Sequence, residues 1–128
     1  MMGIVLNQCM SEARRRTTEV AVGPELTAFQ QNILVILTEE PMYGLAIKRE
    51  LEEYYATEVN HGRLYPNLDD LVEMGLVEKS ELDKRTNQYA LIDDGFDAVA
   101  NRVEWIASKF VTDGDRADRL VNAIESKR

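Results

Sequence analysis

The stretch that decides the fold is residues 60–76, which read NHGRLYPNLDDLVEMGL. Asn60 is a good helix N-cap, because its side chain can accept a backbone N–H that the first turn leaves unpaired, and Gly75 suits the left-handed residue that ends a helix. Apolar residues recur between these ends at the helical spacing i, i+4, i+7 and i+8, namely Leu64, Leu68, Leu71 and Val72. The stretch therefore predicts one helix with a buried face and an outward-facing beginning.

A proline lies inside this predicted helix. Pro66 removes a backbone hydrogen bond, and its ring meets the carbonyl four residues earlier, which belongs to Gly62. Because a glycine backbone can shift more easily than any other, the spacing Gly62-x-x-x-Pro66 predicts a kinked helix beginning that is shaped in advance. The alternative is a buried helix that tolerates an awkward proline.

The residues around this stretch predict two supporting helices and a hairpin. Residues 26 to about 38 are apolar nearly all round, which indicates a buried central helix. Pro41 breaks the chain, and a second helix begins at Tyr43-Gly44 and ends near Tyr55. Beyond the stretch, residues 77–82 and 88–92 alternate partly and flank a polar tip, Asp83-Lys84-Arg85-Thr86-Asn87, a spacing that predicts a β-hairpin.

The end of the chain predicts helices that meet a second copy. Acidic residues at Asp93-Asp94 suit the positive end of a helix dipole, and this helix runs to about Phe110. Its apolar seam has spacings of 3, 4, 3 and 4, typical of two packed helices, and consists of Phe96, Val99, Val103, Ile106 and Phe110. Trp105 widens the apolar side, which favours a dimer over a seam that packs back on its own domain. A last helix is predicted over residues 115 to about 126.

Length and composition predict one globular domain of 128 residues, with 45% hydrophobic and 30% charged residues. The net charge of −8 is not the default for a nucleic-acid binder. The basic residues are unevenly distributed, however, and several fall in or near the elements described above. Only five of the 15 basic residues are lysine, and this acidic, lysine-poor composition resembles that of proteins from a very salty cytoplasm.

Several function classes find no support in the residues. A single cysteine, Cys9, and a single histidine, His61, exclude a cysteine-rich or multi-histidine metal site within one chain. We find no nucleophile–base pairing and no phosphate-binding loop, so we expect neither an enzyme nor a cofactor. No apolar run reaches the roughly 20 residues of a membrane span, and the beginning lacks a basic signal region. We therefore expect a cytoplasmic protein with no membrane partner.

Residues 1–24 are expected to form a flexible N-terminal arm that ends at Gly23-Pro24. Its cluster Arg14, Arg15 and Arg16 is a possible DNA-reaching arm, or else a solvated tail. Met10 is an alternative start, in which case the natural product lacks Cys9.

The predicted fold class is mainly α with a small β-hairpin. The order helix, helix, kinked helix and basic hairpin is that of a winged helix-turn-helix, whose third helix enters the major groove of DNA and whose wing reaches the backbone or minor groove. We expect a DNA-binding domain over residues 25–93 and a C-terminal helical dimerisation segment over residues 94–128.

Over residues 26–95 the sequence resembles that of the PadR family of transcriptional regulators. The matching segments are YGLAIKREL (43–51), GRLYPNLDDLVEMGLV (62–77) and NQYAL (87–91), and the G-x-L-Y-P motif is the most specific of them. The resemblance implies a homodimer that binds a pseudo-palindromic DNA site, with a short tail as the dimerisation element. It also implies a regulator of the stress response, oxidative stress in particular, in a high-salt cytoplasm. Asp69-Asp70 stand where the family often carries a basic residue, so we expect the leading end of the helix to dock most deeply.

Arg63 is the residue we expect to read a base, because a guanidinium matches the two acceptors of a guanine edge. Its alternative is a surface arginine paired with Glu58 or Glu53. Asn67 is a candidate for adenine or phosphate, and Tyr65 for a phosphate contact or for core packing. His61 is a first-turn surface residue or a pH switch. The full set of expected DNA-binding residues is Tyr43, Lys48, Arg49, Asn60, His61, Arg63, Tyr65, Asn67, Lys84, Arg85, Thr86, Asn87 and Gln88.

Further assignments also keep alternatives. Lys48 and Arg49 can pair with neighbouring acidic residues instead of DNA, and the hairpin tip can be a merely solvated turn. Trp105 either fills the core of a dimer or, as the family resemblance implies, lines a pocket for a flat aromatic ligand of unknown identity. A protein-interaction module with a winged-helix fold and no specific DNA binding is the alternative function.

Overall fold

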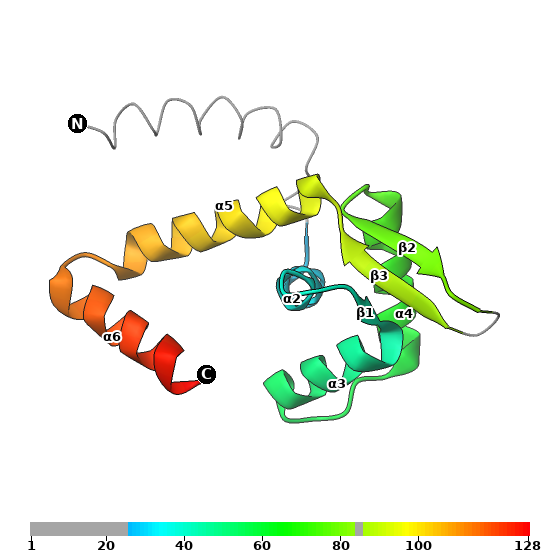
Figure 1. Cartoon of the computed structure of the whole chain (residues 1–128), viewed down its shortest axis with the longest axis horizontal. Helices are drawn as coiled ribbons and strands as arrows, with labels where there is room; N and C mark the ends of the chain where they lie inside the picture. The colour runs from blue at the N-terminus through cyan, green and yellow to red at the C-terminus, as the bar shows by residue number, and fades with distance from the viewer. Residues whose placement is uncertain (1–25, 84–85) are drawn as a thin grey trace.

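The computed structural model describes residues 26–83 and 86–128, and Figure 1 shows how its elements are arranged. The expected arm over residues 1–24, with Cys9 and Arg14, Arg15 and Arg16, lies outside the described residues, and so do Lys84 and Arg85. The elements in chain order are α2 (Ala28–Leu37), β1 (Met42–Tyr43), α3 (Gly44–Tyr55), α4 (His61–Glu73), β2 (Val77–Glu81), β3 (Asn87–Leu91), α5 (Asp93–Phe110) and α6 (Gly114–Ser126).

Helix α2 is the centre of the fold, as its apolar composition predicts. It contacts α3, α4, α5 and β3, and Ile33 and Leu34 are almost fully buried. Thr27 and Gln30 form a capping box in which each side chain accepts the other residue's backbone N–H at 3.1 Å. The box sets the first helical residue at Ala28, two residues after the predicted beginning.

Helices α3 and α4 form the helix-turn-helix. Helix α3 ends at Ala56 in the left-handed conformation, with φ of 57°, and the Glu52 carboxylate then accepts the backbone N–H of Val59 at 2.9 Å. The turn between the two helices is thus held by a side chain of α3 itself. This places the beginning of α4 next to the end of α3.

Both predicted ends of α4 are confirmed. The Asn60 side chain accepts the backbone N–H of Gly62 at 2.6 Å, and Gly75 has a φ of +78° after the helix. Leu64, Leu68 and Leu71 are fully buried, and Val72 packs at the edge of the core. The helix continues through Pro66 as one element, and the expected kink stays a prediction.

The sheet has three antiparallel strands in the order β1-β3-β2, where the sequence predicted a two-stranded hairpin. Strands β2 and β3 form the predicted hairpin, with Val77 opposite Leu91. Strand β1 is not predicted by the sequence, which places the beginning of a helix at Tyr43. Its two residues pair with β3, Met42 opposite Tyr89, and a strand of two residues carries no periodicity.

Helix α5 leaves the winged-helix part and α6 folds back beneath it, as Figure 1 shows. The joint is tight: the Leu76 carbonyl accepts the backbone N–H of Ile92 at 3.1 Å, and a Cβ atom on Gly95 would lie 2.2 Å from the same carbonyl oxygen. Helix α6 has no buried residue. In the part of the chain that the structure describes, no helix is long and apolar enough to cross a bilayer.

Candidate nucleic-acid interface

The leading end of α4 projects from the domain with exposed side chains. His61 and Arg63 lie in its first turn, and both are exposed. Backbone N–H groups at a helix beginning are unpaired and carry partial positive charge, which suits a phosphate group. The leading end therefore combines a positive helix terminus with a cationic side chain.

Tyr65 joins the leading end of α4 to the beginning of α3. Its ring stacks on His61, with centroids 5.6 Å apart and planes 4° from parallel. A Cβ atom on Gly44 would lie only 2.6 Å from the Tyr65 hydroxyl oxygen, so a larger residue there would displace the Tyr65 side chain. Tyr65 is half-buried and packs against the core, which agrees with the packing role expected for it, while the phosphate contact stays a prediction.

Arg63 lies on the opposite flank of α4 and rests on an aromatic ring of α2. Its guanidinium carbon is 4.0 Å from the centroid of Phe29, a cation–π contact. The expected alternative, a pair with Glu58 or Glu53, is not found among the described residues. The charge of Arg63 is therefore not neutralised by a carboxylate there.

Both ends of the Asn67 side-chain amide form a hydrogen bond within the subunit. Its Oδ1 accepts a hydrogen bond from Gln30 Nε2 at 3.0 Å, and its Nδ2 donates to the Arg63 carbonyl at 2.7 Å. Each end of the amide can still form one further hydrogen bond, so the assignment of Asn67 to adenine or phosphate stays a prediction beside this bracing role. Gln30 was missed, although the spacing Thr27-x-x-Gln30 is a capping signal that marks this residue.

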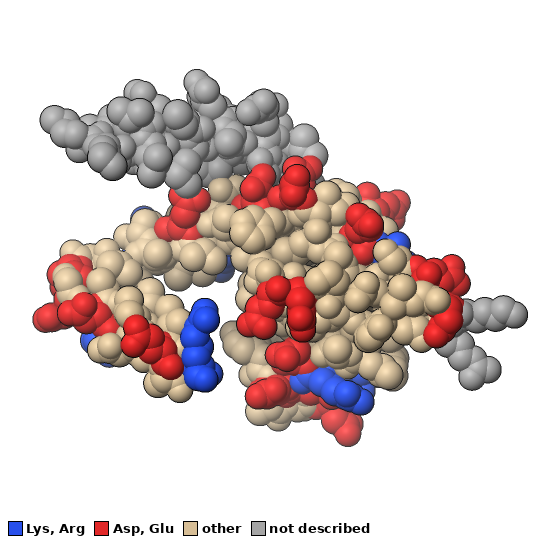
Figure 2. Space-filling view, viewed as in Figure 1, with Lys and Arg blue, Asp and Glu red and all other residues tan. Residues whose placement is uncertain are grey.

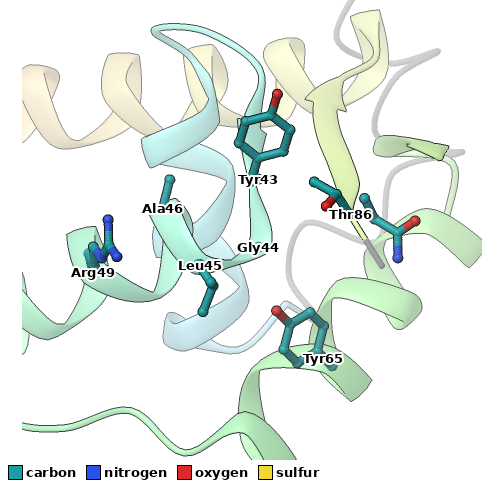
Figure 3. A pocket seen from close by; sticks show the side chains of 8 residues that line it. Tyr43, Gly44, Leu45, Ala46, Arg49, Tyr65 and Thr86 are labelled. Atoms are coloured by element: carbon teal, nitrogen blue, oxygen red, sulfur yellow. The ribbon is translucent and has the colours of Figure 1, made fainter. Parts of the chain in front are cut away.

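A hollow of about 320 Å³ lies beside the leading end of α4. Figure 3 shows side chains from the beginning of α3, from α4 and from the wing facing it. Its lining consists of Tyr43, Gly44, Leu45, Ala46, Arg49, Tyr65, Thr86 and Asn87. Five of the predicted DNA-binding positions are thus brought together, namely Tyr43, Arg49, Tyr65, Thr86 and Asn87. Two further lining residues, exposed Leu45 and half-buried Ala46, were not predicted.

The two basic residues of α3 differ in their surroundings. Lys48 pairs with Glu52 at 3.3 Å, as the alternative reading of the sequence expected, whereas Arg49 is exposed and lines the hollow. The wing residues Asn87 and Gln88 are half-buried at the beginning of β3, and Gln88 lies opposite Tyr43 in the sheet. Arg49 is therefore the stronger candidate of the two for a phosphate contact.

The trailing half of α4 is acidic. Asp69, Asp70 and Glu73 are exposed there, and only Asp69 has a cation nearby, Lys79 at 3.9 Å, in the described part of the chain. Figure 2 shows acidic side chains spread over the visible face of the molecule. Because these carboxylates repel phosphate, DNA is better accommodated by the leading end of α4 than along its whole length.

Two pKa values near the interface are shifted. The Val59 N–H bond lowers the pKa of Glu52 below 4.5, against partial burial, and Lys48 adds to the lowering. Burial raises the pKa of Tyr89 above 10.0, and the nearby Asp69 adds to the rise. Both groups therefore stay in their ordinary protonation states at neutral pH.

The predicted apolar seam of α5 is divided between two environments. Val99 is 9% exposed and belongs to the core of its own subunit, where α5 packs on α2 and β3, so little of its side chain is left for the predicted dimer contact. The other members of the seam are 41–57% exposed, namely Phe96, Val103, Ile106 and Phe110. Trp105 lies beside the seam rather than in it, with Arg102 at 5.5 Å and Lys109 at 5.9 Å from its ring.

These elements define the class of protein. A helix-turn-helix of α3 and α4, followed by the antiparallel strands β2 and β3, is a winged helix-turn-helix. The predicted fold class, mainly α with a small β part, is confirmed.

The comparisons give the family. The model of the transcriptional regulator PadR-like family matches residues 33–101, and this chain belongs to that family. RosR of Halobacterium salinarum, in its complex with S4, is 67% identical, with 82% of this chain and 91% of that chain covered and a TM-score of 0.78. RosR from crystals grown with NaBr is 68% identical, with 80% and 94% covered and a TM-score of 0.77.

A more distant structure supports the fold alone. Bacillus subtilis PadR in complex with operator DNA is 20% identical, with 60% of this chain and 47% of that chain covered and a TM-score of 0.53. No curated protein sequence matches the chain.

Proposed function

We propose that this protein is a sequence-specific DNA-binding transcriptional regulator that acts as a homodimer. The observation that carries the proposal is the leading end of α4, where exposed Arg63 carries no carboxylate partner among the described residues and the hollow adjoins the wing. Arg63 reads a guanine edge in the major groove. Tyr43, Arg49 and the wing residues Thr86, Asn87 and Gln88 contact the backbone beside it.

The exposed apolar residues of the tail support the homodimer. In one subunit α5 and α6 leave uncovered Phe96, Val103, Ile106, Phe110, Leu120, Val121 and Ile124. A run of apolar side chains of this size on a small protein is expected to be covered by a partner. A second copy related by a two-fold axis places two reading helices about 34 Å apart, one turn of the DNA helix, so the site is a pseudo-palindrome.

High salt changes which forces contribute to binding. The acidic composition and the haloarchaeal relative support a cytoplasm near molar salt, where the screening length falls to about 3 Å. Release of counterions from DNA then adds much less to affinity. We therefore assign most of the specific affinity to direct hydrogen bonds, shape and dimer symmetry, and expect a shallow fall of affinity between low and molar salt.

The test begins with genome-wide mapping of bound sites, which supplies an operator duplex. The affinity for that duplex is then divided by the affinity for a shuffled duplex, which gives the operator preference. Arg63→Met keeps an aliphatic stem over Phe29 but loses the guanidinium, so the preference should fall about 5- to 150-fold per reading contact. Arg119→Met, an exposed change on α6, is the control and should leave the preference unchanged.

The alternative is an acidic winged-helix module that binds proteins, and the exposed carboxylates of the trailing half of α4 favour it. In that case the wild-type protein has no operator preference, and Arg63→Met changes nothing. A preference for mapped sites that Arg63→Met abolishes excludes the alternative.

The signal and the effector are tested separately. Mapping bound sites before and after peroxide treatment tests the expected role in oxidative stress; unchanged occupancy contradicts it. Trp105 is the only tryptophan and is 56% exposed, so its fluorescence reports directly on a flat ligand or a partner at this position. Fluorescence that changes with protein concentration alone, and not with added aromatic compounds, favours a dimer contact over an effector site.

A further inference from the structure

Arg63 is tied to α2 through its side chain. The guanidinium lies over the ring of Phe29, 4.0 Å from its centroid, and Phe29 is only 4% exposed. A guanidinium stacks through its flat face, whereas its N–H groups point outward in the plane from its edge. The contact with Phe29 restrains the guanidinium over the ring, and no carboxylate pairs with it among the described residues, so its N–H groups remain available to donate to a base.

Arg63 is also tied to α2 through its backbone. Gln30, which follows Phe29, donates to Asn67 at 3.0 Å, and Asn67 donates to the Arg63 carbonyl at 2.7 Å. Gln30 is 6% exposed, and the capping box with Thr27 holds it at the beginning of α2. Two neighbouring residues of α2 thus hold both the main chain and the side chain of one residue of α4.

The ring of Phe29 is itself held in place. It stacks on Tyr55 at the end of α3, with centroids 6.2 Å apart and planes 16° from parallel. The Tyr55 hydroxyl accepts a hydrogen bond from Asn32 Nδ2 at 2.8 Å, which fixes Tyr55 to α2. The ring on which the guanidinium rests is therefore held in place by contacts with α2 and α3.

We propose that Phe29 is a positioning residue for base reading: its buried ring holds the Arg63 guanidinium in the orientation that reads DNA. The inference rests on the proposed function, because it requires Arg63 to contact a base. It extends that function by placing a determinant of specificity in α2, a helix with no assigned DNA contact. Because ordering a long side chain on binding costs affinity, an arginine oriented in advance should bind its base more tightly.

A purely structural role makes a different prediction. If Arg63 only shields Phe29 from water, the pair contributes to folding, and losing the ring affects operator and shuffled DNA alike. If Phe29 positions Arg63, losing the ring affects the operator alone, and only while Arg63 is present. A double-mutant cycle separates the two roles.

The experiment compares the full-length wild-type protein with Phe29→Leu, Arg63→Met and the double variant. Fluorescence anisotropy on labelled operator and shuffled duplexes gives the operator preference of each. We expect Phe29→Leu to lower the preference about two- to tenfold, with affinity for the shuffled duplex unchanged. In the Arg63→Met background the same leucine should have no effect on preference.

Three results would overturn the inference. If Phe29→Leu leaves the preference unchanged and Arg63→Met lowers it, the positioning role of Phe29 is refuted and the proposed function stands. A leucine effect of equal size with and without Arg63 would make Phe29 a structural residue. An unchanged preference in Arg63→Met would overturn both the inference and the reading role of Arg63.

A second measurement needs no variant that might unfold. In wild-type protein the ring current of Phe29 should shift the Arg63 Nε–H proton resonance upfield in free protein, and the shift should persist when operator DNA is added. An Arg63 resonance at an ordinary shift in both states would contradict the inference.

Discussion

The winged-helix part and the C-terminal helices are stabilised in different ways. From α2 to β3, apolar side chains meet in one core, and Ile33, Ile47 and Leu68 are fully buried. Beyond β3, Val99 is the only residue of that core among the described ones, and α6 buries nothing. The first part thus has its own core, whereas α5 and α6 leave most of their large apolar side chains exposed in the single subunit.

The largest expected effect lies in the core. Leu68→Ala leaves a cavity at a fully buried site and should lower the free energy of unfolding by about 2–5 kcal/mol. Val35→Ala, at a residue of α2 that is 48% exposed, should change it by less than about 0.5 kcal/mol. Chemical denaturation at several protein concentrations measures both. Equal losses would remove the distinction between core and surface.

The next effect concerns the tail. Leu120→Glu combined with Ile124→Glu places two charges on the apolar stripe of α6. The double variant should raise the dissociation constant of the proposed dimer at least about 30-fold, which corresponds to the loss of one strong interface contact. Sedimentation equilibrium measures this change. Asn122→Glu on the same helix is the control, since it adds a charge at an exposed polar position. A double variant that stays dimeric would place the dimer contact elsewhere.

A smaller effect is expected at the joint between the two parts. Gly95→Ala forces a methyl group against the Leu76 carbonyl and should cost about 1–3 kcal/mol, the usual range for overpacking. Gly114→Ala is the matched control, because nothing lies within 4 Å of the added carbon and its φ is ordinary. The control should be neutral or stabilising by up to about 1 kcal/mol. Thermal unfolding compares the two variants. Equal midpoints would mean that the backbone around Leu76 shifts to accommodate the added methyl group.

The smallest effect is that of pH on the turn before α4. The folded-state pKa of Glu52 is lowered, chiefly by the Val59 N–H, so its contribution to stability is present above the usual pKa of 4.5 and is lost as pH falls through the lowered value. Glu52→Gln should therefore be less stable than wild type at neutral pH, with the difference shrinking below pH 4.5. Glu53→Gln, at the exposed neighbour, is the control. A difference independent of pH would assign the loss to the hydrogen bond alone.

The elements that could be predicted are those determined by residues close together in the sequence. Asn60 and Gly75 fix the ends of α4 by short-range bonds and backbone conformation, so both ends could be read from neighbouring residues. The fold class and family followed from the order of such elements and from one motif. Strand β1 could not be read, because its two residues become a strand only by pairing with β3.

The site was predictable in part. Its residues could be placed on elements, and Tyr43, Arg49, Tyr65 and Thr86 indeed share a hollow. What each side chain touches could not be read, because the partners are distant in the chain. Gln30 and Asn67 are 37 positions apart, and no periodic pattern in the sequence predicts the hydrogen bond between their side chains. Phe29 lies in the helix that the sequence predicts to be buried, and its contact with Arg63 forms only when α2 and α4 pack together.

The close approach of Gly95 to the Leu76 carbonyl has a mechanical consequence. Helix α5 has 18 residues and is therefore about 27 Å long, so it acts as a lever on whatever is attached to its far end. A tilt of about 10° at its base moves the tip by about 5 Å, which is more than the 3.4 Å between neighbouring base pairs. In a dimer joined through α5, a small displacement at Gly95 would change the distance between the two copies of α4, so that they no longer match successive major grooves. If the proposed dimer binds DNA through α4, a change at this joint would abolish that binding without altering any residue of the proposed interface.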